Sequence, residues 1–94
     1  MKPSIELLKK ALKACADAHH VDFEQWTEDE QIGIRSEDVP VVADIRIICR
    51  AFCGEANIVE TGWGYTTIYL DEAVFLPEVD MQSLSLALPH GTTI

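Results

Sequence analysis

The chain has 94 residues, of which 48% are hydrophobic, and a formal net charge of −9. This length suits one domain with a single core, and the hydrophobic content excludes a disordered chain. The negative charge argues against direct binding to nucleic acid phosphates, and no apolar run reaches the roughly 18 residues of a membrane span.

The charge is unevenly distributed along the sequence. Residues 1–13 hold four lysines and one acid, whereas all later residues hold three arginines and fifteen acids. Such a field repels nucleic acid and attracts basic surfaces. The lysines and Glu6 interrupt any apolar segment of a signal peptide, and the three cysteines lack the spacing of a disulfide framework. We therefore expect a cytoplasmic protein with reduced thiols.

The first half of the chain predicts a helix followed by two strands. Residues 4–19 are expected to be an amphipathic helix, because their apolar side chains recur at helical spacing. Short strands are expected over residues 21–26 and 31–35, where apolar and polar residues partly alternate. Gly33 weakens the second strand and can mark a bulge.

A second helix and a hairpin are predicted next. The helical spacing of apolar residues is clearest over 39–53, with Asp38 as a cap. Residues 57–61 and 65–70 are expected to be strands joined by Gly62-Trp63-Gly64. Two glycines around a short tip make this the strongest hairpin signal in the chain.

The remaining residues are predicted to add strands. Residues 73–76 precede a proline and are expected to form one, and residues 83–88 alternate as a strand would, although Asp80 can equally cap a short helix. The order is then roughly α-β-β-α-β-β-β. The sequence predicts a single α+β domain over residues 1–94, in which two helices cover one face of a mostly antiparallel sheet of roughly four to six strands.

An acidic stretch is the first candidate site. Between residues 22 and 38 Arg35 is the only cation, against seven acids: Asp22, Glu24, Glu28, Asp29, Glu30, Glu37 and Asp38. On a hairpin and the loop that enters a helix, these carboxylates are expected to point outward and lie near one another. A rigid surface with clustered carboxylates can occupy a basic groove that normally binds phosphates. The alternative is a solvated face that only keeps the protein soluble.

An aromatic stripe is the second candidate site. Trp63, Tyr65 and Tyr69 have the same parity and are expected to line one face of a strand, whereas Ile68 has the other parity and suits the core. If the helices cover the Ile68 side, the aromatic side chains are exposed and can anchor a protein interface. The alternatives are that they belong to the core or that residues 71–94 fold over them.

Metal binding and catalysis have weaker signals. Cys49 and Cys53 are four residues apart on a helix and could bind zinc with His19 or His20, but structural zinc sites usually present two such pairs. Buried cysteine also behaves as a small hydrophobic residue. We therefore predict no metal, no cofactor and no catalytic residues, and an enzyme is the least expected class.

Together these features predict a small acidic binding protein that inhibits a partner by occupying its basic, nucleic-acid-binding surface. The expected partner-binding residues are the seven acids together with Trp63, Tyr65 and Tyr69. In its profile, short, acidic and without motifs, the chain resembles small phage-encoded inhibitors such as anti-CRISPR proteins, which implies a viral nucleic-acid mimic. Immunity proteins and antitoxins that neutralise a nuclease share the profile. The alternative is an oligomerising or scaffold module, such as a homodimer that pairs through residues 81–94; neither nucleic acid nor membrane is an expected partner.

Overall fold

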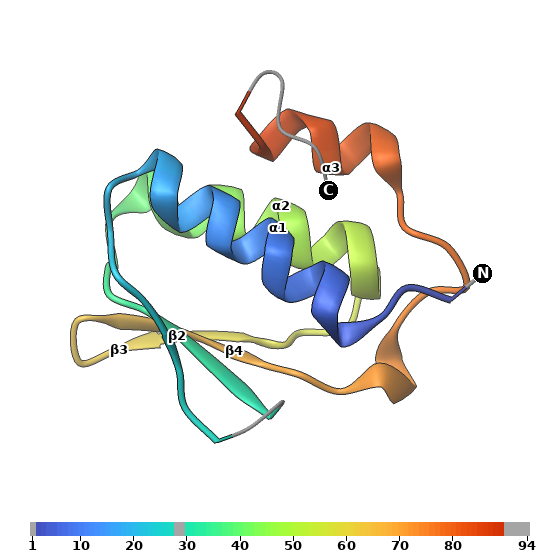
Figure 1. Cartoon of the computed structure of the whole chain (residues 1–94), viewed down its shortest axis with the longest axis horizontal. Helices are drawn as coiled ribbons and strands as arrows, with labels where there is room; N and C mark the ends of the chain where they lie inside the picture. Colours follow the sequence, from blue (N-terminus) through green and yellow to red (C-terminus); the bar gives the residue numbers. More distant parts are fainter. Residues whose placement is uncertain (1, 28–29, 90–94) are drawn as a thin grey trace.

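The α-helices of the described chain lie on one side of a single sheet (Figure 1). The computed structural model describes residues 2–27 and 30–89. Within these residues the elements follow one another in the order α1 (Ile5–Ala18), β1 (Phe23–Gln25), β2 (Gln31–Ile34), α2 (Val39–Cys53), β3 (Val59–Gly62), β4 (Tyr65–Tyr69), η1 (Glu72–Val74) and α3 (Met81–Ala87). The predicted α+β class, with an antiparallel sheet and the two long helices on one face, is confirmed.

The two long helices begin and end close to the predicted residues. Oγ of Ser4 accepts a hydrogen bond from the backbone N–H of Leu7 at 3.2 Å and so caps α1. Helix α2 carries Pro40 in its first turn and ends at Gly54, whose φ of 58° is one that other residues rarely adopt. The apolar faces of both helices pack against each other and against the sheet.

The described strands form an antiparallel sheet in the order β1-β2-β4-β3. On the face toward the helices, Ile32 and Ile34 of β2 and Ile68 of β4 are fully buried. The register is continuous across the sheet through one row of four residues: Glu24, Gly33, Thr67 and Glu60. Gly33 therefore lies in regular pairing and not in a bulge.

The predicted strand over residues 73–76 is wrong. The segment forms the short 3-10 helix η1, because Oδ1 of Asp71 accepts a hydrogen bond from the backbone N–H of Ala73 at 2.9 Å and closes a turn. The chain then returns to the core: the ring of Phe75 meets that of Phe52 edge to face, with centroids 6.1 Å apart. The N–H of Leu76 donates to the carbonyl of Phe52 at 2.7 Å.

The predicted strand over residues 83–88 is also wrong, and the alternative helix is observed. Both oxygens of Asp80 bond to Ser83, accepting from its N–H at 3.2 Å and from its hydroxyl at 2.8 Å, so this side chain starts α3. Leu84 is buried against α2 while Leu86 is exposed, as helical spacing requires. Pairing of two copies through a strand in this segment is therefore not supported; residues 90–94 lie outside the described residues.

Candidate functional site

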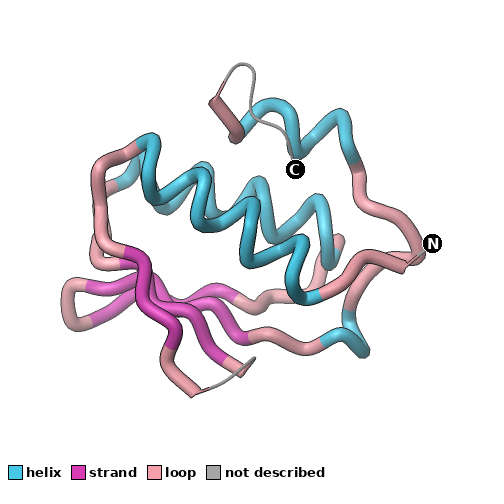
Figure 2. The backbone as a smooth tube through the Cα atoms, in the orientation of Figure 1, coloured by secondary structure: helices cyan, strands magenta, loops and turns pink. Residues whose placement is uncertain are grey.

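One face of the sheet is covered by no other described element (Figures 1 and 2). The helices lie on the side of Ile68, and α3 packs on α2 beyond the sheet, so the described residues after β4 turn away from this face. We call it the open sheet face. From the strand register and the residues that flank it, its side chains are Asp22, Glu24, Trp26, Gln31, Arg35, Glu60, Tyr65, Thr67 and Tyr69.

Trp26 lies across the middle of the open sheet face. A Cβ atom placed on Gly33 would overlap the six-membered ring of Trp26, so the missing side chain leaves the space in which the indole lies. The indole also meets the ring of Tyr65 edge to face, with centroids 5.0 Å apart. Trp26 is not among the site residues predicted from the sequence; the signal for it was a glycine inside a strand.

This packing predicts that Gly33→Ala lowers the free energy of unfolding by about 1–3 kcal/mol, because the new methyl group must displace the indole of Trp26. Urea unfolding followed by circular dichroism measures the change. Gly62→Ala is the matched control, since nothing lies within 4 Å of a Cβ atom at Gly62. Equal stability of the Gly33→Ala variant and the wild type would contradict this position of Trp26.

Both tyrosines of the open sheet face are bonded to carboxylates. The hydroxyl of Tyr69 donates to Oε2 of Glu60 at 3.0 Å, and a hydrogen bond between Tyr65 and Glu24 is the main cause that raises the pKa of Tyr65. The bond to Glu60 likewise raises the pKa of Tyr69. Oε2 of Glu24 is shielded from solvent and has no hydrogen-bond partner among the described residues. The hydrogen bonds to Glu24 and Glu60 therefore favour the neutral form of both tyrosines.

Arg35 is the cation of the open sheet face. Its Nη1 lies 4.0 Å from Oδ2 of Asp22, and its guanidinium carbon lies 5.9 Å from the ring centroid of Tyr65. Both side chains of the ion pair are well exposed, so solvent screens the interaction. The sequence predicted Asp22 as a site residue but not that Arg35 would offset its charge.

The β3–β4 hairpin places Trp63 at the rim of the open sheet face. Gly62 pairs with Tyr65, so the turn consists of Trp63 and Gly64, with φ values of 58° and 83°. Two residues with positive φ form the type I′ turn that suits a two-residue hairpin. The side chain of Trp63 is fully exposed. The backbone N–H of Gly64 donates to Oε2 of Glu37 at 3.0 Å, which ties the start of α2 to this tip.

The structure divides the predicted acidic stretch between two ends of the sheet. Glu37 and the exposed Asp38 lie at the hairpin-tip end, whereas Glu30 lies at the other end, where its carbonyl accepts from the N–H of Leu70. The four residues of β2 lie between the two ends. At a rise of roughly 3.3 Å per residue, the ends are more than about 10 Å apart. Glu28 and Asp29 lie outside the described residues. At the hairpin tip the predicted carboxylates are thus Glu37, which binds the N–H of Gly64, and its neighbour Asp38. Asp22 precedes β1, at the opposite edge of the sheet from β3.

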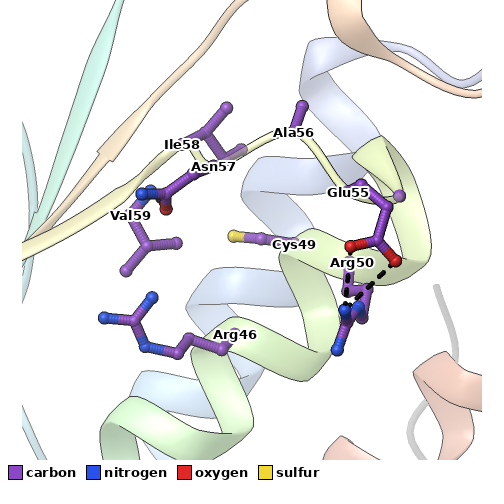
Figure 3. A pocket seen from close by; sticks show the side chains of 9 residues that line it. Arg46, Cys49, Arg50, Glu55, Ala56, Asn57, Ile58 and Val59 are labelled. Atoms are coloured by element: carbon purple, nitrogen blue, oxygen red, sulfur yellow. Dashed lines mark hydrogen bonds and ion pairs between the residues drawn. The ribbon is translucent and has the colours of Figure 1, made fainter.

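A shallow hollow between α2 and the segment before β3 carries the arginines of α2 (Figure 3). Its volume is about 210 Å³. Both oxygens of Glu55 bind the guanidinium of Arg50 at 3.2 Å. Arg46 has no ion pair or hydrogen bond within the described part of the chain, and its guanidinium points toward Val59. This hollow lies on the helix side, away from the open sheet face.

The cysteines and histidines weighed as zinc ligands from the sequence do not form a group of ligands in the described structure. Within residues 2–27 and 30–89, the group of potential metal ligands is a different one: Cys15, His19 and Asp44, whose donor atoms lie within 4.8 Å of one another. Cys49 and Cys53 are buried in the core. Burial raises the pKa of Cys53 to about 11, and burial is also the main cause that raises the pKa of Cys49. His19 belongs both to this group and to the ligands weighed from the sequence. Asp44 could not be found from the sequence, because only tertiary packing brings α2 beside His19.

Searches of protein-family models, curated proteins and solved structures find no match to this chain. Among the described residues, none of the helices has the length and apolar character needed to cross a membrane.

Proposed function

We propose that this protein binds a partner protein through Trp63 and the open sheet face, and that it inhibits the partner by occupying a basic surface that otherwise binds nucleic acid. The partner contributes arginine and lysine side chains, and the carboxylates around Trp63 pair with them. The mechanism needs no catalysis: the bound protein excludes the nucleic acid by its volume and its charge.

The conformation of Trp63 carries this proposal. A left-handed backbone costs an ordinary L-residue roughly 1–2 kcal/mol, and type I′ turns favour asparagine and glycine at this position. The indole of Trp63 is fully exposed, so packing within the chain does not offset this cost. Strained residues gather at functional sites, and tryptophan is one of the residues enriched among the anchors of protein interfaces.

The charges near Trp63 support a basic partner. Glu37 and Asp38 at the hairpin tip are exposed, and so is Asp22, which pairs with Arg35 at the other edge of the sheet. Arg46 of α2 lines a hollow with Glu37. The four lysines lie within residues 1–13, in and before α1, which packs on the opposite side of the sheet. Acids thus outnumber cations both on the open sheet face, where Asp22, Glu24 and Glu60 stand against Arg35, and at the hairpin tip, while the lysines belong to α1 and the residues before it. Long-range attraction of this kind accelerates association and weakens as salt is added.

A capture experiment with matched variants tests the proposal. The tagged protein is incubated with nuclease-treated lysate of the source organism or its host and washed at low and high salt. We expect a nucleic-acid-binding protein to be retained at low salt and released at high salt. Glu37→Gln with Asp38→Asn should reduce its retention, because two exposed carboxylates at the hairpin-tip end are lost while the glutamine amide oxygen can still accept the bond from Gly64.

The control removes the same charge elsewhere. Glu6→Gln with Asp17→Asn neutralises two exposed carboxylates of α1, on the far side of the sheet. This variant should retain the partner as the wild type does. Equal losses in both variants would mean that net charge, and not the surface around Trp63, controls capture, and retention that is insensitive to salt would contradict the electrostatic mechanism.

A further inference from the structure

We propose that Cys15, His19 and Asp44 form a binding site for a divalent transition-metal ion, with Zn²⁺ as the preferred occupant. Nothing in the proposed partner binding requires this site, which lies between α1 and α2 on the helix side of the sheet. Zinc is bound in proteins by thiolate, imidazole and carboxylate groups, and these three side chains supply one of each.

The end of α1 positions the first two ligands. Cys15 and His19 are one helical turn apart, and the N–H of His19 donates to the carbonyl of Cys15 at 3.1 Å. The helix then closes in a Schellman motif, in which the N–H groups of the two residues after His19 donate back to carbonyls of the last turn at 3.2 and 3.0 Å. This motif fixes the backbone of His19, so its ring and the thiol face the same side of the helix.

Asp44 completes the group from the neighbouring helix. Its Oδ2 lies 2.8 Å from Nε2 of His19. Within the described chain no lysine or arginine pairs with Asp44. All donor atoms of the group lie within 4.8 Å of one another. With Zn–S near 2.3 Å and Zn–N near 2.0 Å, ligand atoms around one tetrahedral ion lie about 3.5 Å apart, so no pair of this group needs to close by more than about 1.3 Å.

The burial of the three side chains leaves an entry path. Cys15 is 1% exposed, whereas the side chains of His19 and Asp44 are 25% and 31% exposed. An ion can therefore approach from the side of the imidazole and carboxylate and reach the thiolate beneath them. Three protein ligands leave a fourth position for water, as in zinc sites that are open to solvent. The strong negative charge of the chain also favours cations.

The competing interpretation is a hydrogen bond between His19 and Asp44 beside a thiol that packs in the core. The two interpretations differ in one observable, the bond from sulfur to metal. The test is therefore a titration of the reduced, metal-free full chain with Co²⁺. This ion replaces Zn²⁺ in such sites and, unlike Zn²⁺, gives absorption bands that report its ligands. Binding of one equivalent, with a thiolate-to-cobalt band in the near ultraviolet and the visible bands of four-coordinate cobalt, is expected; added Zn²⁺ should remove them.

Variants assign the band to this site. Cys15→Ser and His19→Gln should each abolish the charge-transfer band or weaken Co²⁺ binding at least tenfold. Asp44→Asn should also weaken Co²⁺ binding. Cys53→Ala, which removes a buried thiol outside the group, should leave the spectrum unchanged. Circular dichroism tests whether each variant is folded. If Cys15→Ser does not fold, His19→Gln still tests the site, because His19 lies at a partly exposed helix end. Absence of the band in the wild type, its survival in a folded Cys15→Ser variant, or unchanged Co²⁺ binding in His19→Gln would overturn the proposal.

Discussion

Replacing Phe52 by alanine is expected to lower the free energy of unfolding by about 3–5 kcal/mol, the range for removing a buried aromatic ring. Phe52 is fully buried and its ring meets that of Phe75 edge to face. Its carbonyl accepts from the N–H of Leu76, so the same residue fastens the segment between η1 and α3 onto α2. Loss of the ring leaves a cavity where α2 and the C-terminal segments meet.

Urea unfolding followed by circular dichroism measures this effect. Phe52→Leu is the matched control, because it keeps an apolar side chain and should cost clearly less than the alanine variant. The slope of the transition should be unchanged if only the folded state is affected. A loss below about 1 kcal/mol for Phe52→Ala would place the ring outside the core, since exposed substitutions cost that little.

Alkaline pH is expected to destabilise the protein by several kcal/mol between about pH 9 and pH 11. Burial raises the pKa of the Cys53 thiol from 9.0 to about 11 and raises that of Cys49 further. A group whose pKa is raised by folding stabilises the fold below its unfolded pKa, and this stability is lost as the pH rises through the folded value. A tenfold change in acidity between the folded and unfolded states corresponds to about 1.4 kcal/mol, so the Cys53 thiol alone accounts for about 2 kcal/mol at pH 11. The buried thiols of Cys49 and Cys15, whose pKa values are also raised, add to this loss.

The measurement is urea unfolding in reducing buffer at several values between pH 7 and pH 11. We expect stability to be level up to about pH 8.5, just below the ordinary cysteine pKa of 9.0, and to fall above it. Cys53→Ala should make the fall shallower by roughly the share of one thiol, whatever it costs at pH 7. The raised pKa values of Tyr65 and Tyr69 act in the same direction. Constant stability up to pH 11 would show that the thiols are open to solvent.

The elements that the sequence predicts correctly are those whose signals are local. Helix α2 follows from apolar residues at helical spacing, with Gly54 as the stop. The hairpin follows from the glycines around Trp63, and the parity of β4 correctly places Ile68 in the core and Tyr69 on the exposed face. In each case a short-range rule and the tertiary structure favour the same conformation.

The errors arise where two local rules compete or where contacts are distant in sequence. The alternation of Ser and Leu over residues 83–88 favours a strand, but two hydrogen bonds between Asp80 and Ser83 start a helix instead. Two other contacts join different segments of the chain: Trp26 lies over Gly33, and Asp44 lies beside His19. Neither pair has a spacing in the sequence that indicates the contact, so these parts of the candidate sites emerge only from the fold.

The stability and the binding of the Trp63→Asn variant test the central claim most directly, that the hairpin tip holds this indole for a partner. Asparagine suits the left-handed position of a type I′ turn, so the free energy of unfolding should rise by about 0.5–1 kcal/mol. Retention of the captured partner at low salt should fall in the same variant. A variant that is less stable than the wild type, or one that retains the partner equally well, would contradict the account.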